Sequence, residues 1–210
     1  AQMRELYAAG WAIGNHTYSH QYVSYFANAT AALNDIIAAR TRIGQGMAPL
    51  APGFRSTAFT APYVDMAYLP IVRDNAATLG IYLFQGSGNE IRQVDSVAYG
   101  PDGFLAIGRN GIRHIDPDFD TVHSLVTAYP KNHYWLSLHT HIVDPGCDPV
   151  ETSIDYLYNT YGPGGTDEVW VAPAEIVHQY LVTRDMSSVP ARATISSTPP
   201  PGLSLELARP

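Results

Sequence analysis

Two histidines four residues apart, His16 and His20, are the residues whose types and spacing most directly suggest chemistry. They follow a short apolar stretch, residues 11–14, that is expected to form a strand. If the polar turn after it closes into one helical turn, both imidazoles lie on the same face. Two neutral imidazoles at this spacing can hold one divalent metal ion, as on the helices of zinc hydrolases. A surface pair without any role is the alternative, and the spacing alone does not choose between them.

Polar residues also follow two other predicted strands. His139 and His141 close the clearest of these, residues 133–139, and Pro62 and Tyr63 follow another. Histidine titrates near neutral pH, so it can donate the proton that expelling an amide nitrogen requires. In parallel (β/α) barrels the active site forms at the carboxyl ends of the strands. The three groups are therefore expected at one end of the sheet.

The elements that must position these residues alternate between strands and helices. Apolar runs predict strands over residues 11–14, 54–60, 81–84, 104–107, 133–139 and 168–171. Helical periodicity or helix boundary signals predict helices over residues 2–9, 29–43, 66–79, 119–129, the latter part of 147–161, and 173–183. This alternation is typical of parallel α/β architecture. Residues 1–185 are expected to form one domain, and residues 186–210 a linker or the start of a small β domain.

Composition narrows the functional classes. The 210 residues carry a formal net charge of -7 and no basic cluster, which argues against a nucleic-acid-binding surface. No apolar run approaches the length that spans a bilayer, so membrane insertion is not expected. Cys147 is the only cysteine, so no internal disulfide can form. The 14 tyrosines suit a sugar-binding cleft, although a protein core uses them as readily.

Residues 9–20, Ala-Gly-Trp-Ala-Ile-Gly-Asn-His-Thr-Tyr-Ser-His, resemble the second motif of the polysaccharide deacetylase family, also called the NodB-homology domain or carbohydrate esterase family 4. The match includes residues on both sides of the histidines. The resemblance implies a hydrolase that removes acetyl groups from N- or O-acetylated sugars, with His16 and His20 as ligands of a divalent metal ion, Zn²⁺ first among them. It also implies a distorted (β/α) barrel, an acetylated oligo- or polysaccharide such as chitin as substrate, and a secreted or cell-envelope location.

Three further stretches carry the resemblance. Trp-Leu-Ser-Leu-His-Thr-His, ending at His141, resembles the fifth motif, whose histidine protonates the leaving group; His139 is expected in that role, with His141 as the alternative. Phe-Thr-Ala-Pro-Tyr resembles the third motif, in which the backbone N–H at the Tyr63 position stabilises an oxyanion. Pro62 and Tyr63 are therefore expected at the substrate. Trp170 lies in a stretch similar to the family's last strand and is expected either beside the substrate or in the core.

The chain departs from the third and fourth motifs of the family. Thr60 stands where the third motif has an arginine that orients the catalytic base, and Val64 stands where it has glycine. Arg55 lies nearby in the sequence and is a candidate substitute for that arginine; the alternative, which we favour, is an exposed surface arginine. The fourth motif, Asp-x-x-Asp-Trp, is not found where it is expected, and only Asn89 or Glu90 offers part of its chemistry there.

The first motif, Thr-Phe-Asp-Asp-Gly, is also not found. It supplies the family's catalytic base and third metal ligand, and only 15 residues precede His16. We therefore expect an incomplete barrel that lacks its first strand, followed by a short proline- and serine-rich β-like tail. Such a chain is expected to bind metal weakly and to turn over slowly or not at all by itself.

Two other functions stay open on the sequence. The departures from the third and fourth motifs favour a catalytically inactive, carbohydrate-binding barrel. A hydrolase of non-sugar amides on the same scaffold is the second, because the irregular, glycine-containing residues 86–118 can reshape the cleft.

Overall fold

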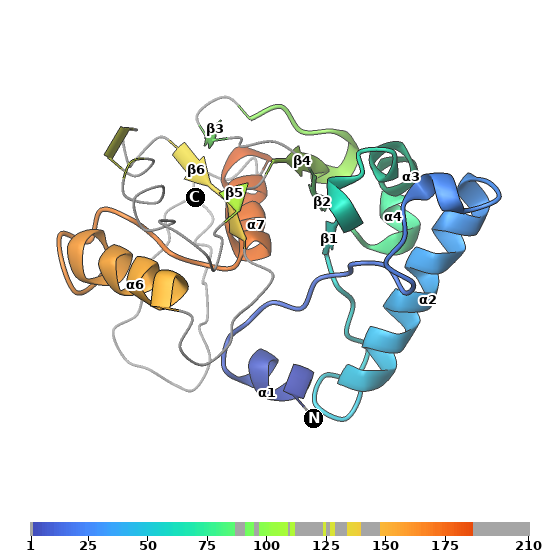
Figure 1. Ribbon diagram of the computed structural model, residues 1–210, viewed down its shortest axis with the longest axis horizontal. Helices are drawn as coiled ribbons and strands as arrows, with labels where there is room; N and C mark the ends of the chain where they lie inside the picture. Colours follow the sequence, from blue (N-terminus) through green and yellow to red (C-terminus); the bar gives the residue numbers. More distant parts are fainter. Residues whose placement is uncertain are drawn as a thin grey trace, which may run out of the picture.

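The structure is a computed structural model that describes residues 2–86, 91–94, 97–108, 110–111, 124, 127–128, 134–139 and 148–186. The expected tail beyond residue 186 and most of the expected helix over residues 119–129 lie outside these ranges. The described part is mixed α/β, with a small parallel sheet and six α-helices (Figure 1). The expected α/β class is confirmed at this level, and the described strands form no closed barrel.

A three-stranded parallel sheet lies at the centre of the molecule. Its strands, in spatial order, are β1 (Ala58–Thr60), β2 (Leu83–Gln85) and β4 (Leu105–Ile107). The strand expected over residues 11–14 is reduced to a single parallel bridge between Asn15 and Phe59. Two smaller pairs lie beside the sheet. They are β3 (Ile91–Gln93) antiparallel to β6 (Tyr134–Leu136), and β5 (Asn110–Gly111) parallel to β7 (Leu138–His139).

The helices follow the predicted order, with differences at their boundaries. They are α1 (Gln2–Ala8), α2 (Ala29–Met47), α3 (Tyr68–Asp74), α4 (Ala76–Leu79), α6 (Asp148–Tyr156) and α7 (Ala174–Met186). Short 3-10 turns occur at η1 (Val23–Tyr25), η2 (Pro62–Val64) and η3 (Pro101–Gly103), and a π-helical turn, η5 (Leu157–Tyr161), continues α6. Within these ranges, no helix combines the length and the apolar character that crossing a membrane requires.

Local side-chain hydrogen bonds decide several of the helix ends. Asn28 caps α2, because its side chain accepts from the Ala31 N–H at 2.9 Å. The single helix expected over residues 66–79 is divided at Asn75, whose side chain donates to the Ile71 carbonyl oxygen at 2.8 Å. Residues 168–171 were expected to form a strand. They have no regular secondary structure and precede α7.

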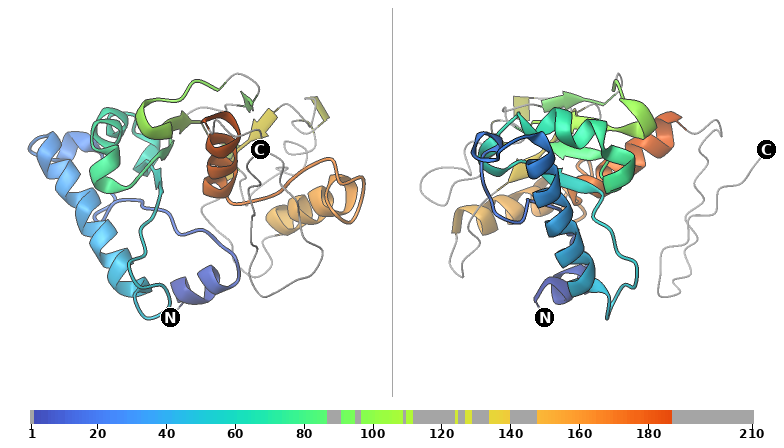
Figure 2. Two further views of the ribbon diagram at one scale, coloured as in Figure 1. Left: turned by 180° about the vertical axis from the view of Figure 1, so that it is seen from behind. Right: turned by 90° about the vertical axis from the view of Figure 1, so that its right-hand side faces the viewer.

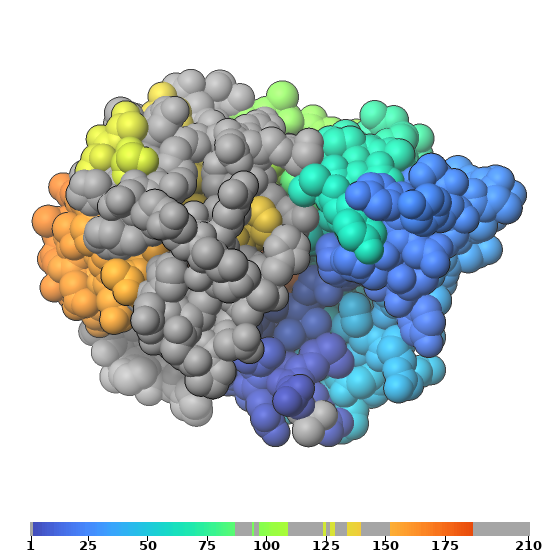
Figure 3. Space-filling view, in the orientation of Figure 1, coloured from blue at the N-terminus to red at the C-terminus, as the bar shows by residue number. Residues whose placement is uncertain are grey.

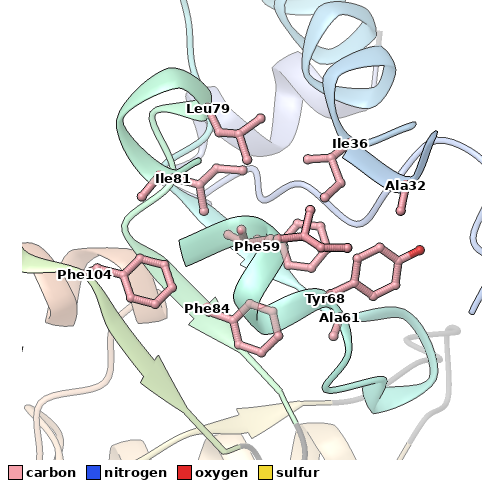
Figure 4. Close-up of a cluster of buried hydrophobic side chains, with 12 residues drawn as sticks. Ala32, Ile36, Phe59, Ala61, Tyr68, Leu79, Ile81, Phe84 and Phe104 are labelled. Atoms are coloured by element: carbon pink, nitrogen blue, oxygen red, sulfur yellow. The ribbon is translucent and has the colours of Figure 1, made fainter. Parts of the chain in front are cut away.

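Side chains of the sheet alternate between two hydrophobic cores, as the period of a strand requires. Phe59 and Phe84 point into the core shared with α2, α3 and α4 (Figure 4). Ala58 and Leu83 point to the opposite face, where they pack with Trp135 and with apolar residues of α7. Figure 2 shows α2 and α7 on opposite sides of the strands. The two faces are therefore both covered, as parallel sheets require.

Helix α7 is tied to the sheet by two buried or partly buried polar residues. The Nε2 atom of His178, which is buried, hydrogen-bonds with the Gly103 carbonyl oxygen at 2.8 Å, just before β4. The side chain of Glu175 accepts from the Thr57 hydroxyl at 3.3 Å, just before β1. Burial raises the pKa of Glu175 and lowers the pKa of His178, in both cases against the opposing effect of the hydrogen bond.

His178 should make the stability of the protein depend on pH. Because its folded-state pKa lies below 6.5, the unfolded chain binds more protons at this residue as the pH falls below that value. The contribution of a neutral His178 to stability is therefore present near pH 8 and is lost as the pH is lowered toward 5. His178→Gln removes the titration, so the difference in free energy of unfolding between wild type and variant should narrow between pH 8 and pH 5 in urea titrations. A difference that is the same at both pH values would contradict this assignment.

Candidate functional site

The histidine turn begins at Asn15, a fully buried polar residue that joins three segments. Its backbone N–H donates to the Ala58 carbonyl and its own carbonyl accepts from the Thr60 N–H, both at 2.9 Å, so it stands beside β1. Its side chain donates to the Ile36 carbonyl of α2 at 3.0 Å and accepts from the Thr17 N–H at 2.9 Å. The start of the turn is thus held against both β1 and α2.

The turn itself is not helical, so the condition under which the spacing would bring both imidazoles to one helix face is not met. Thr17 and His20 have positive φ angles of 65° and 53°, in the left-handed region. Side-chain oxygens take the place of helical hydrogen bonds. One carboxylate oxygen of Asp35 accepts from the N–H groups of Tyr18 and Ser19 at 3.0 and 3.1 Å, and the Thr17 hydroxyl accepts from the His20 N–H at 3.1 Å.

The two predicted metal ligands nevertheless lie together. The ring centroids of His16 and His20 are 4.8 Å apart and the rings meet edge to face. The Nδ1 atom of His16 lies 2.6 Å from the Thr60 carbonyl oxygen, which only accepts, so Nδ1 carries the proton. In metal sites a ligating histidine almost always donates its other ring N–H to an acceptor of this kind. The second nitrogen, Nε2, is then the one suited to a metal ion.

The pair by itself is a partial metal site. Imidazole nitrogens suit zinc and similar ions, and a catalytic zinc site uses about three protein ligands. Within the described ranges, no group of three or more His, Cys, Asp or Glu side chains is arranged to hold a metal ion. The donor chemistry and the orientation of His16 fit such an ion, while the described residues supply two ligands.

Tyr63 lies directly beside the pair, in a strained turn. Its ring centroid is 4.6 Å from that of His20. Tyr63 and Val64 both have positive φ angles, 52° and 54°, which is unusual for a β-branched residue such as valine. Conformations of this kind cost about 1–3 kcal/mol each and concentrate at functional sites. The third family motif has glycine at the position of Val64, and glycine adopts this conformation without strain.

The backbone N–H of Tyr63 is a candidate oxyanion donor. No hydrogen bond between described residues uses this N–H, although the neighbouring Val64 and Asp65 N–H groups both donate within the turn. Pro62, which precedes it, is buried and cannot donate. The Tyr63 N–H is therefore a backbone donor, close to His20, that no acceptor within the described ranges engages.

A chain of polar contacts links the ends of three strands, and the sequence analysis did not identify its central residue. The Thr60 hydroxyl donates to the side-chain oxygen of Gln85 at 3.1 Å, and the Gln85 side-chain nitrogen donates to the Ser137 hydroxyl at 3.3 Å. Thr60 and Gln85 are directly paired at the ends of β1 and β2. Ser137 lies two residues before His139. A polar residue at the carboxyl end of a buried strand was the signal that could have identified Gln85.

The remaining predicted site residues are His139, His141 and Trp170. His139 ends β7, paired with Gly111 of β5, and is half-buried. His141 lies outside the described residues. Trp170 is 56% exposed, so it is not a core residue, and it packs edge to face on Tyr180 of α7 rather than on the histidine turn.

Of the suggested substitutes for missing family residues, the structure describes only Arg55. Arg55 comes before β1 begins, at the opposite end of that strand from Thr60, and therefore does not replace the arginine of the third motif. Asn89 and Glu90 lie outside the described residues. A scan against protein-family models gives no match for this chain, and a search of curated proteins gives none either.

Loss of the Asn15 side chain should destabilise the fold and not only the turn. Asn15→Ala leaves the Thr17 N–H without its acceptor and removes a donor to α2, and an unsatisfied buried group costs about 1–3 kcal/mol. We expect the free energy of unfolding, measured by urea denaturation, to fall by about that amount. Asn159→Ala is the matched control, because Asn159 is exposed and such changes stay within about 0.5 kcal/mol. Equal effects of the two substitutions would show that Asn15 does not anchor the turn.

Proposed function

We propose that this protein is a metal-dependent hydrolase that removes acetyl groups from an acetylated glycan, on an incomplete (β/α) barrel of the polysaccharide deacetylase type. The observation that carries the proposal is the orientation of His16. Its Nδ1 is held by the Thr60 carbonyl, so Nε2 is the nitrogen suited to a metal ion, and the ring of His20 lies 4.8 Å away between centroids. The resemblance to polysaccharide deacetylases also implies that this activity is located outside the cell or at its envelope.

In this proposal His16 and His20 hold the metal ion, and the third ligand is the aspartate of the family's first motif, which is not found in this sequence. A divalent ion such as Zn²⁺ supplies a Lewis acid for the acetyl carbonyl and lowers the pKa of a water molecule. The two histidines need only be neutral and oriented, and the hydrogen bond of His16 provides the orientation.

The other residues act on the charge and the proton of the reaction. Hydrolysis adds water across the acetyl C–N or C–O bond and releases acetate with an amine or alcohol. The Tyr63 N–H donates to the carbonyl oxygen as it becomes negative. His139 gives a proton to the leaving nitrogen or oxygen, with His141 as the alternative donor. Gln85 and Ser137 link the segment of His139 to the end of β1 through side-chain hydrogen bonds.

One observation favours an inactive, carbohydrate-binding barrel as the second candidate. Thr60 occupies the place of the arginine that orients the base in the family, and its hydroxyl is engaged with Gln85. Arg55 lies at the other end of β1. Under this alternative the glycan still binds beside Tyr63, and no acetate is released.

Metal content and acetate release separate these functions. We expect wild type to bind about one Zn²⁺ per chain, with weak affinity, by calorimetry and to release acetate only slowly from acetylated oligosaccharides, and His16→Ala/His20→Ala to do neither. His178→Gln is the control, because it removes a histidine of the α7 interface and leaves the pair intact.

Two results would overturn the deacetylase proposal. Glycan binding that chelators do not disturb, without acetate release, would establish the inactive barrel. Metal binding that is the same in wild type and in the double variant would show that His16 and His20 are not the ligands.

A further inference from the structure

A continuous series of aromatic rings extends from the histidine pair over the surface. The ring of Tyr63, next to His20, stacks on Tyr22 with centroids 4.4 Å apart and planes 10° apart. Tyr25 then meets Tyr22 edge to face at 5.6 Å. All three tyrosines are exposed, with exposed fractions of 49% for Tyr63, 39% for Tyr22 and 72% for Tyr25. We refer to Tyr22, Tyr25 and Tyr63 as the tyrosine surface.

The tyrosine surface is supported by two partly buried hydrogen bonds. The carboxylate of Asp65 accepts from the Val23 N–H at 2.8 Å, and so joins the η1 turn to the segment that follows Tyr63. The hydroxyl of Tyr68, a buried residue, donates to the Gln21 carbonyl at 2.7 Å. Burial first, and then the charges of Asp35 and Asp65, raise the pKa of Tyr68 to about 12, so the hydroxyl keeps its proton. In Figure 3 the η1 turn and the segment that follows Tyr63 lie side by side on one face of the molecule.

The chemistry of this surface selects a neutral ligand with both apolar and hydroxyl-bearing faces. Tyrosine combines a flat apolar ring with a polar hydroxyl, and a group of exposed aromatic rings is typical of a binding surface. The charged side chains that contact its supporting turns, Asp35 and Asp65, are carboxylates engaged by backbone N–H groups. The chain also carries a net charge of -7, so a polyanion is disfavoured.

We propose that Tyr22 and Tyr25 form a subsite for a neutral pyranose ring of a glycan, adjacent to the sugar whose acetyl group faces the histidine pair. This inference rests on the proposed function. Tyr63 is next to His20, so its place along the series is that of the reacting sugar. Tyr25 is the most exposed ring and the one farthest along the series, and it serves sugars that only a longer oligosaccharide can present.

The dependence on glycan length tests the subsite. The probes are N-acetylated chitooligosaccharides and O-acetylated xylooligosaccharides, each as a disaccharide and a hexasaccharide, with affinity measured by calorimetry and KM from acetate release. Tyr25→Ala should weaken hexasaccharide binding by roughly 3- to 10-fold, the effect of losing one ring contact, and leave the disaccharide unchanged. Tyr25→Phe should retain most of the affinity, because it keeps the ring.

Tyr158→Ala is the matched control, since Tyr158 is a similarly exposed tyrosine on η5. The urea midpoint of each variant verifies that it is folded. If Tyr25→Ala binds both lengths as wild type does, or weakens both equally, the subsite is refuted while acetate release that depends on His16 and His20 upholds the proposed function. If wild type neither binds nor deacetylates any of these glycans, both proposals fall.

Discussion

The buried amide of Asn15 is the contact on which the candidate site depends. A polar side chain without water is costly unless its hydrogen bonds are made within the protein. Asn15 makes its hydrogen bonds only when β1, α2 and the histidine turn are all in place, because β1 supplies two partners for its backbone and α2 and the turn each supply one for its side chain. The amide therefore couples formation of the core to formation of the turn. His16 follows it directly, so the orientation of the ring is decided by the same packing that builds the sheet.

Backbone strain gathers around the histidine pair, and anchoring contacts lie directly beneath it. Thr17, His20, Tyr63 and Val64 all adopt left-handed conformations. Such angles persist only where surrounding contacts determine them. Asp35 and Asp65 supply them here, because each carboxylate accepts from two backbone N–H groups. Hydrogen bonds to charged acceptors are worth about 1.5–3 kcal/mol each, which is comparable to the strain they oppose.

Patterns local to the sequence were predictable, and contacts between distant segments were not. Apolar periodicity located α2, one face of which is buried, and short apolar runs located the strands β2 and β4, which are buried on both faces. The spacing of the histidines also identified two rings that do meet. The conformation that brings them together is not the helical turn considered from the sequence, because the turn is held by Asp35, 17 residues beyond Tyr18, and no local pattern contains that contact. Gln85 was missed for the same reason, since its partners lie 25 and 52 residues away.

Thr60 connects the two halves of the proposed chemistry through different atoms. Its carbonyl oxygen orients His16, and its hydroxyl engages Gln85, which in turn contacts Ser137 before His139. An arginine at this position has no short hydroxyl to give Gln85, so the departure from the family motif changes which side chains are held together. The orientation of His16 survives the change, because it depends on the backbone carbonyl and not on the side chain. Metal-ligand geometry and base orientation are therefore separable at this position, which is why an oriented histidine pair is compatible with either an active or an inactive barrel.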